Sequence, residues 1–137
     1  MAFEITRIIA GKRKTAVAKL RFKIGTGKVF FNYLPSAELP LFHKLALSEP
    51  LRLYEQELGD PLKVDFHIKG FGGGKEAQIQ AARLAIAKAL LYITGSETLK
   101  KTFIKYDRNM IVADSRRKEA NKPNDSAPRA RRQKSYR

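Results

Sequence analysis

The sequence predicts an α+β protein: a mixed four-stranded sheet with helices packed on one face, followed by a long extended C-terminal tail. Stretches that alternate between apolar and polar residues lie in the first half of the chain, whereas the longest helical periodicity begins after residue 74. Strands that precede helices, instead of alternating with them, favour the α+β class. The chain has 137 residues, which suits one domain of ordinary size. We therefore predict a compact α/β domain over residues 1–105 and an extended basic tail over residues 106–137.

Four segments are predicted as strands. Residues 3–9 are rich in β-branched and aromatic side chains, and residues 63–69 alternate between apolar and polar ones. Residues 16–24 alternate most clearly, which predicts one buried face and one face toward water. The buried face would hold Ala16, Ala18, Leu20, Phe22 and Ile24, and the wet face Lys19, Arg21 and Lys23. Residues 28–32 would return from a glycine turn at residues 25–27 and form a hairpin with the preceding strand.

The second half of the domain favours helices. The longest helix is predicted from Lys75 to Thr94, where six alanines favour helix and allow close packing against a sheet. Gly95 suits the C-terminal cap of this helix, and Ser96 suits the N-terminal cap of another helix that ends near Lys105. Earlier in the chain, two short helices are predicted on either side of Pro50, over residues 41–47 and 51–58.

Charge is distributed unevenly along the chain. The formal net charge is +15, which indicates a nucleic acid or another anionic surface as partner. Residues 7–28 carry eight cations and no acid, residues 29–68 have a net charge of −3, and residues 100–137 have a net charge of +9. A solvated surface would mix the two signs, so two basic ends favour a directed contact with a polyanion. The chain has no cysteine and therefore no disulfide or thiolate metal site.

Other classes of protein are disfavoured. No segment approaches the ~20 apolar residues that a membrane-spanning helix needs, and the N-terminus lacks the basic start and apolar run of a signal peptide. His43 and His67 are the only histidines, and they have no metal-ligand spacing. The acids at positions 55, 57, 60 and 65 are interpreted as solvated surface charges and not as a catalytic acid/base pair. We therefore predict no enzyme activity, no cofactor and no metal.

The last fifteen residues, 123–137, cannot order themselves by burial. They contain two prolines and a single large hydrophobic residue, Tyr136, and five of the final nine residues are Lys or Arg. Ordering fifteen residues costs roughly 15–30 kcal/mol in backbone entropy. The segment is therefore either disordered or ordered by a large polyanion.

Two basic clusters and one glycine run provide candidate phosphate-binding sites. The segment Gly11–Ala16 places three consecutive cations at a predicted turn next to the positive strand face. Arg108 and the run Arg116–Lys118 form another cluster, with Tyr106 beside it as a residue that either stacks on an unpaired base or packs on the domain. The run Gly70–Gly74 precedes a helix but ends in no Gly-Lys-Ser/Thr, so it favours a close approach of backbone to RNA, or a tight turn, over a nucleotide site.

Several of these segments together carry a family resemblance. They are Gly11–Ala16, Gly72–Gly74 followed by Ala77-Gln78, the stretch from Ala82-Arg83 to Lys88–Leu90, Tyr106–Arg108, and the ending Arg129–Arg137. In this order, over nearly the whole chain, they resemble the small-subunit ribosomal protein S-nine family. The last five residues are similar to the archaeal and eukaryotic branch, and the short N-terminus is similar to archaeal members.

The resemblance implies a structural protein in the head of the small ribosomal subunit, located in the cytoplasm within the ribosome. Its partners would be small-subunit ribosomal RNA, neighbouring ribosomal proteins of the head, and the peptidyl-site transfer RNA that the tail approaches. With the charge pattern, it implies ribosomal RNA contacts at Lys12, Arg13, Lys14, Thr15, Lys19, Arg21, Lys23, Lys28, Gly72, Gly73, Gly74, Arg83, Arg108, Arg116, Arg117, Lys118, Arg129, Arg131 and Arg132. It places nearest the transfer RNA Gln133, Lys134, Ser135, Tyr136 and Arg137.

Two alternatives use the same surfaces. The family's fold is shared with the RNase P protein, so the chain would alternatively be a free-standing RNA-processing subunit. The fold is also shared with galactokinase-like kinases, which leaves a small-molecule phosphotransferase as a further hypothesis that specific nucleotide binding would support.

Overall fold

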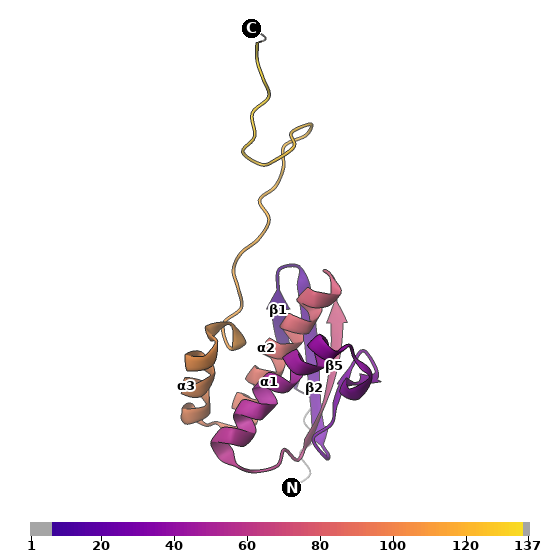
Figure 1. Ribbon diagram of the computed structural model, residues 1–137, viewed down its shortest axis with the longest axis vertical. Coiled ribbons are helices and arrows are strands. Elements are labelled where there is room, and N and C mark those ends of the chain that lie inside the picture. The colour runs from indigo at the N-terminus through magenta and orange to yellow at the C-terminus, as the bar shows by residue number, and fades with distance from the viewer. Residues whose placement is uncertain (1–6, 136–137) are drawn as a thin grey trace.

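The computed structural model describes residues 7–135, which form one five-stranded sheet, three α-helices and two short 3-10 helices (Figure 1). The strands are β1 (Ile9–Arg13), β2 (Ala16–Ile24), β3 (Val29–Phe31), β4 (Leu34–Pro35) and β5 (Val64–Phe71). The helices are η1 (Ser36–Glu38), α1 (Leu41–Leu58), α2 (Lys75–Thr94), α3 (Glu97–Tyr106) and η2 (Arg108–Met110). The predicted α+β class and mixed sheet are confirmed. The predicted four strands become five because β4, with two residues, is too short to show an alternating pattern.

The first strand lies later in the chain than predicted, and residues 3–6 of that prediction lie outside the described residues. Strand β1 takes in the first three residues of the segment 11–16, so the basic turn predicted there is wrong over half its length. Only Lys14 and Thr15 turn the chain toward β2. Gly11 allows β1 to lie close to α2, because a Cβ at this position would collide with the carbonyl oxygen of Ala81.

Strand β5 lies in the middle of the sheet, whose strand order is β1-β2-β5-β3-β4. The predicted hairpin between residues 16–24 and 28–32 is therefore wrong, because β2 pairs antiparallel with β5 instead. Asp65 of β5 holds the glycine turn: its Oδ1 accepts hydrogen bonds from the backbone N–H groups of Thr26 and Lys28, both at 2.8 Å. Strand β3 then runs parallel to β5, and such a pair needs a long connection, which β4, η1 and α1 supply.

The helices follow the predicted pattern except in the middle of the chain. The two short helices predicted around Pro50 are one helix, α1, which continues through the proline. Pro50 is fully buried, and this packing offsets the backbone hydrogen bond that proline cannot donate. Helix α2 has the predicted bounds and ends at Gly95, whose φ is +62°. Ser96 caps α3 as predicted, since its Oγ accepts a hydrogen bond from the backbone N–H of Leu99 at 3.4 Å.

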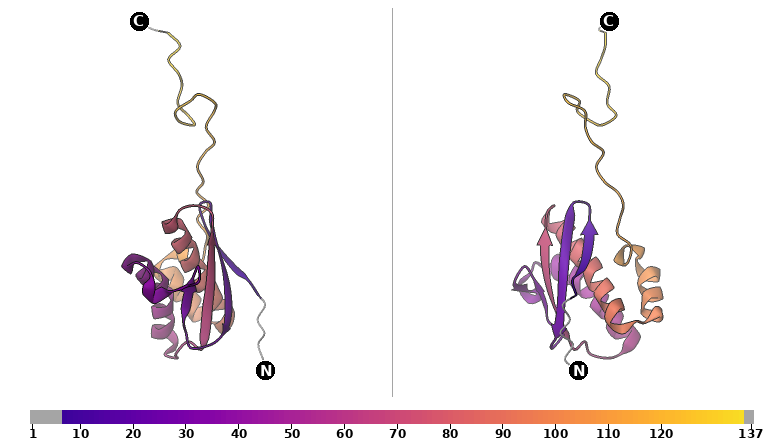
Figure 2. Two further views of the ribbon diagram at one scale, coloured as in Figure 1. Left: turned by 90° about the vertical axis from the view of Figure 1, so that its right-hand side faces the viewer. Right: turned by 180° about the vertical axis from the view of Figure 1, so that it is seen from behind.

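The α-helices cover one face of the sheet, as predicted, and leave the other face open (Figure 2). Ala18 and Phe22 of β2 are buried beneath the helices, whereas Ile24 at the end of that strand is exposed and not buried as predicted. The alanines that allow α2 to approach the sheet are fully buried at positions 81, 82, 85, 87 and 89. Met110 of η2 is also fully buried, so the chain stays fastened to the core up to that residue.

Beyond η2 the chain leaves the domain and runs away from it (Figure 1). Residues 113–135 form no helix or strand, and most of their side chains are exposed. Two turns interrupt this segment, closed by hydrogen bonds from Asp125 N–H to the carbonyl of Lys122 and from Ala130 N–H to the carbonyl of Ala127, both at 3.2 Å. The extended form of the whole tail stays a prediction, as does the division at residue 105.

Candidate nucleic-acid interface

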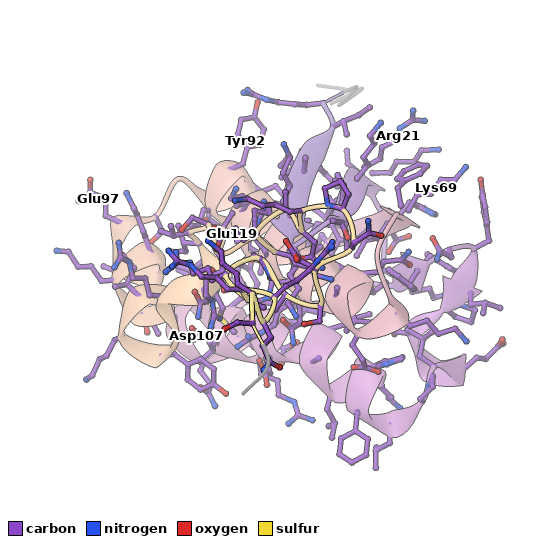
Figure 3. All side chains as sticks on the ribbon, turned by 90° about the horizontal axis from the view of Figure 1, so that it is seen from above. Arg21, Lys69, Tyr92, Glu97, Asp107 and Glu119 are labelled. Carbon is purple, nitrogen blue, oxygen red and sulfur yellow. The ribbon has the colours of Figure 1, made fainter. Side chains whose placement is uncertain are left out.

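The open face of the sheet gathers cations from two neighbouring strands. Lys19 and Arg21 of β2 are exposed on this face, as predicted, and Lys69 of β5 lies beside them. In the antiparallel register Lys19 lies directly opposite Lys69, and Arg21 lies opposite His67. Figure 3 shows Arg21 and Lys69 close together and projecting away from the helices. They line a hollow of about 370 Å³, whose lining contains no Asp or Glu from the part of the chain that the structure describes.

Aromatic rings are interleaved with these cations. The rings of Phe30 and His67 stack, with centroids 4.9 Å apart and planes at 4°. The Nζ of Lys69 lies 5.7 Å from the ring centroid of Tyr33 and 5.6 Å from that of Phe71, within the range of cation–π attraction. The sequence reasoning missed these aromatic residues. The alternation of β5 is the signal that points to Phe71, because it places that ring on the same face as His67 and Lys69.

Two predicted phosphate-binding segments meet at one end of the domain. The turn at Lys14 and Thr15 lies against the glycine loop, where a Cβ on Gly72 would come within 2.9 Å of the Thr15 carbonyl oxygen. Gly72 and Gly73 have φ values of +65° and +61°, which other residues rarely adopt. Gly74 forms the N-cap of α2 without a capping side chain, so the first N–H groups of the helix face outward uncapped. Backbone donors and exposed cations therefore lie together at this end.

A different arrangement holds the root of the tail, the segment from Asp114 to Arg116 directly beyond η2. Arg13 of β1 donates a hydrogen bond to the carboxylate of Asp114, which joins the first strand to the segment beyond η2. Arg116 donates to the same carboxylate, through Nε to Oδ2 at 2.8 Å and through its backbone N–H to Oδ1 at 2.9 Å. These bonds, with the side chain of Arg116 contributing most, hold the pKa of Asp114 well below its usual value of 3.8. In turn, the Asp114 carboxylate raises the pKa of Arg116.

Arg83 of α2 joins three helical segments. Its Nη1 donates a hydrogen bond to Oδ2 of Asp107 at 3.0 Å, at the junction of α3 and η2. Its Nε lies 2.6 Å from Oε2 of Glu49 in α1 and forms an ion pair with it, but the two atoms are not oriented for a hydrogen bond. Arg13, Arg83 and Arg116 are thus predicted RNA-binding arginines that have acidic partners within the protein. Their contact with RNA stays a prediction.

The remaining predicted residues are spread over the domain surface and the tail. Exposed cations are Lys12, Lys23, Lys28, Arg108, Arg117, Lys118, Arg131 and Lys134. Arg129 pairs with Glu119 and Arg132 pairs with Asp125, with N–O distances of 3.2 Å in both pairs. Gln133 donates a hydrogen bond to the carbonyl of Ser135 at 2.7 Å. Tyr136 and Arg137, predicted to lie nearest a transfer RNA, fall outside the described residues.

Residues 7–135 hold neither a metal-binding cluster nor a membrane-spanning helix. No group of three or more His, Asp or Glu side chains in that range is placed to hold a metal ion. No helix there is both long and apolar enough to cross a membrane.

The fold and the site define a small basic α+β protein that gathers cations and aromatic rings on one open sheet face. Residues 11–137 match the family model described as ribosomal protein S9/S16. The chain is 45% identical over 130 residues to the small ribosomal subunit protein uS9 of Methanococcus vannielii, covering 93% of this chain and 95% of that one. It is 44% identical, with the same coverage, to the protein of that name from Methanococcus maripaludis strain C5. The chain therefore belongs to the ribosomal protein S9/S16 family.

Proposed function

We propose that this chain is a structural, non-enzymatic constituent of the small ribosomal subunit in the cytoplasm, where it binds ribosomal RNA and neighbouring ribosomal proteins. The observation that carries the proposal is the 45% identity, over 93% of this chain, to a protein named for the small ribosomal subunit. The hollow on the open sheet face supports it, because its lining holds Lys19, Arg21 and Lys69 and no described acid. Such a surface suits a phosphate backbone.

Two regions of the chain have different roles in this function. Residues 1–105 form the RNA-binding domain, and residues 106–137 form an extended basic tail that ribosomal RNA orders. The end of the tail, residues 133–137, approaches transfer RNA in the peptidyl site during translation. Supporting this, described residues 113–135 have exposed cations and no large apolar side chain with which to fold on themselves.

Co-sedimentation tests the first part of the proposal. We expect the full chain to remain with small subunits through a wash in high salt, because many phosphate contacts act together with a large buried surface. A free-standing RNA-processing subunit would dissociate from ribosomes in the same wash. Release of the chain together with loosely bound factors would overturn the ribosomal assignment.

Removal of Arg137 tests the role of the tail. The guanidinium of this residue is suited to a forked contact with a phosphate. We expect small subunits that carry the shortened chain to assemble normally and to bind peptidyl-site transfer RNA more weakly. Failure of assembly would instead mean that the last residue is structural. Unchanged transfer RNA binding, after removal of residues 133–137 as well, would contradict the proposed contact.

A further inference from the structure

We propose that the hollow on the open sheet face is a binding site for one unpaired RNA nucleotide, whose base stacks on the rings of Phe71 and Tyr33 while its phosphate lies against Lys19 and Lys69. The inference rests on the proposed RNA-binding function and adds to it a defined site and a mode of recognition. It follows from charge, ring exposure and the shape of this face.

The first observation is the pairing of like charges. Lys19 and Lys69 lie directly opposite each other in the β2–β5 register. Like charges in this position destabilise a sheet, and neither lysine forms an ion pair with any residue between 7 and 135. A phosphate between the two ammonium groups removes the repulsion. The arrangement is therefore suited to an anionic ligand.

The second observation is the exposure of two aromatic rings beside these lysines. Tyr33 is 83% exposed and Phe71 is 41% exposed, although Phe71 belongs to β5, whose Phe66 and Ile68 are buried in the core. Lys69 lies beside both rings: its Nζ is 3.5 Å from the hydroxyl of Tyr33 and within 6 Å of both ring centroids. Lys19 Nζ lies 5.1 Å from the centroid of Phe71. A cation held beside each ring places a phosphate-binding group next to a stacking surface.

The third observation is the shape of the face. The hollow of about 370 Å³ falls in the range of small-ligand sites, and the stacked rings of Phe30 and His67 form part of its lining. A nucleotide supplies both a flat ring for the aromatic side chains and a phosphate for the lysines. Unpaired bases in RNA are recognised by this combination of stacking and charge.

Fluorescence anisotropy with the full chain tests the proposal. The probes are a short labelled oligoadenylate and an oligomer of the same length that has the ribose-phosphate backbone without bases. We expect Phe71→Leu to weaken binding of oligoadenylate about 5- to 100-fold, as for the loss of one base–aromatic stack, and to leave binding of the abasic oligomer unchanged. Phe42→Leu is the matched control, because Phe42 is an exposed ring on α1, 81% accessible, outside the hollow.

Three results would overturn the inference. One is equal weakening of both probes by Phe71→Leu, which would mean that the ring acts through the fold and not by stacking. Another is an equal loss of affinity for oligoadenylate with Phe71→Leu and with Phe42→Leu. The third is displacement of oligoadenylate from the wild-type site by an acidic, aromatic peptide at lower concentration than by unlabelled RNA, which would identify a protein partner. In each case, retention of the variants in small subunits would leave the proposed ribosomal function standing.

Discussion

Two basic regions of this molecule look alike in the sequence and differ in the structure. On the open sheet face, Lys19 and Lys69 lie opposite each other and form no ion pair within the described residues. At the root of the tail, Arg13 binds Asp114, which is 101 residues away in sequence, and Arg83 pairs with Glu49 and Asp107. A cluster of cations therefore forms either a surface for a ligand or an internal support for the fold. The difference is whether acidic residues far away in the sequence form ion pairs with it.

The largest effect that separates the two regions is expected at Arg83. Substitution Arg83→Met leaves Oε2 of Glu49 buried without its cation and removes the hydrogen bond to Asp107. We expect the free energy of unfolding, measured by urea denaturation, to fall by about 1–3 kcal/mol. The same measurement on Lys69→Met should give a change within about 0.5 kcal/mol, because that lysine has no acidic partner in the described chain.

Arg52→Met is the matched control for this comparison. Arg52 is exposed on α1 and forms no ion pair with a described residue. If Arg83→Met lowered stability no more than Arg52→Met does, the internal pairs of Arg83 would not be structural. A reduced affinity for RNA at unchanged stability would then support the predicted RNA contact of Arg83.

The next effect concerns RNA binding by the open face. We expect the double substitution of Lys19 and Lys69 by glutamine to lower the slope of log affinity against log salt concentration by about 0.7 for single-stranded RNA, because the two lysines hold one phosphate and each lost phosphate contact contributes roughly 0.7. Anisotropy titrations at several salt concentrations measure this slope. The stability of the protein should rise slightly, since two opposed like charges are removed. An unchanged slope would show that these lysines do not contact phosphate.

A smaller, local effect is expected at the root of the tail. Substitution Arg13→Gln removes one of the two arginines that hold Asp114, and Arg116 keeps its own bonds to that carboxylate. We expect faster hydrogen exchange at the backbone N–H of Arg116, with little change in global stability and no change in the salt slope of RNA binding. Lys12→Gln, at the exposed neighbouring residue, is the control for hydrogen exchange, and it should leave the exchange of the Arg116 N–H unchanged. A lower salt slope with Arg13→Gln would place Arg13 on the RNA as well.

The parts of the fold that the sequence predicts are those that depend on neighbouring residues. The alternation of β2 before Ile24, the bounds of α2, the Gly95 cap and the Ser96 cap all follow from local patterns, and all are confirmed. The insertion of β5 between β2 and β3 depends on pairing across some forty residues. The glycine turn between β2 and β3 is a local pattern, and it wrongly predicted that these two strands pair with each other. The helix through Pro50 depends on burial that no local pattern shows.

The candidate site divides in the same way. The wet face of β2, with Lys19 and Arg21, was predictable from alternation within one strand. Its opposition to Lys69, and the exposed rings of Phe71 and Tyr33 beside it, required the order of the strands. The pairing of Arg13 with Asp114 was not predictable, because any acid in the chain was an equal candidate. Local chemistry thus identified cations, and tertiary structure assigned their partners.

The smallest effect expected at ordinary pH is at Asp114. The hydrogen bonds from Arg116 and Arg13 lower the folded-state pKa of this carboxyl below 3.8, so its contribution to stability is present above that value and is lost only as the pH falls through the lower folded-state pKa. We therefore expect the root of the tail to be unchanged as the pH falls from neutral toward 4. Carboxyl-carbon chemical shifts of Asp114 measure the titration directly. Substitution Arg116→Gln removes the side chain that lowers the pKa of Asp114 most, so it should move the midpoint of this titration upward toward 3.8. A wild-type midpoint at or above 3.8 would show that Asp114 is not held by the arginines, and the contrast between a paired root and an unpaired sheet face would then fail.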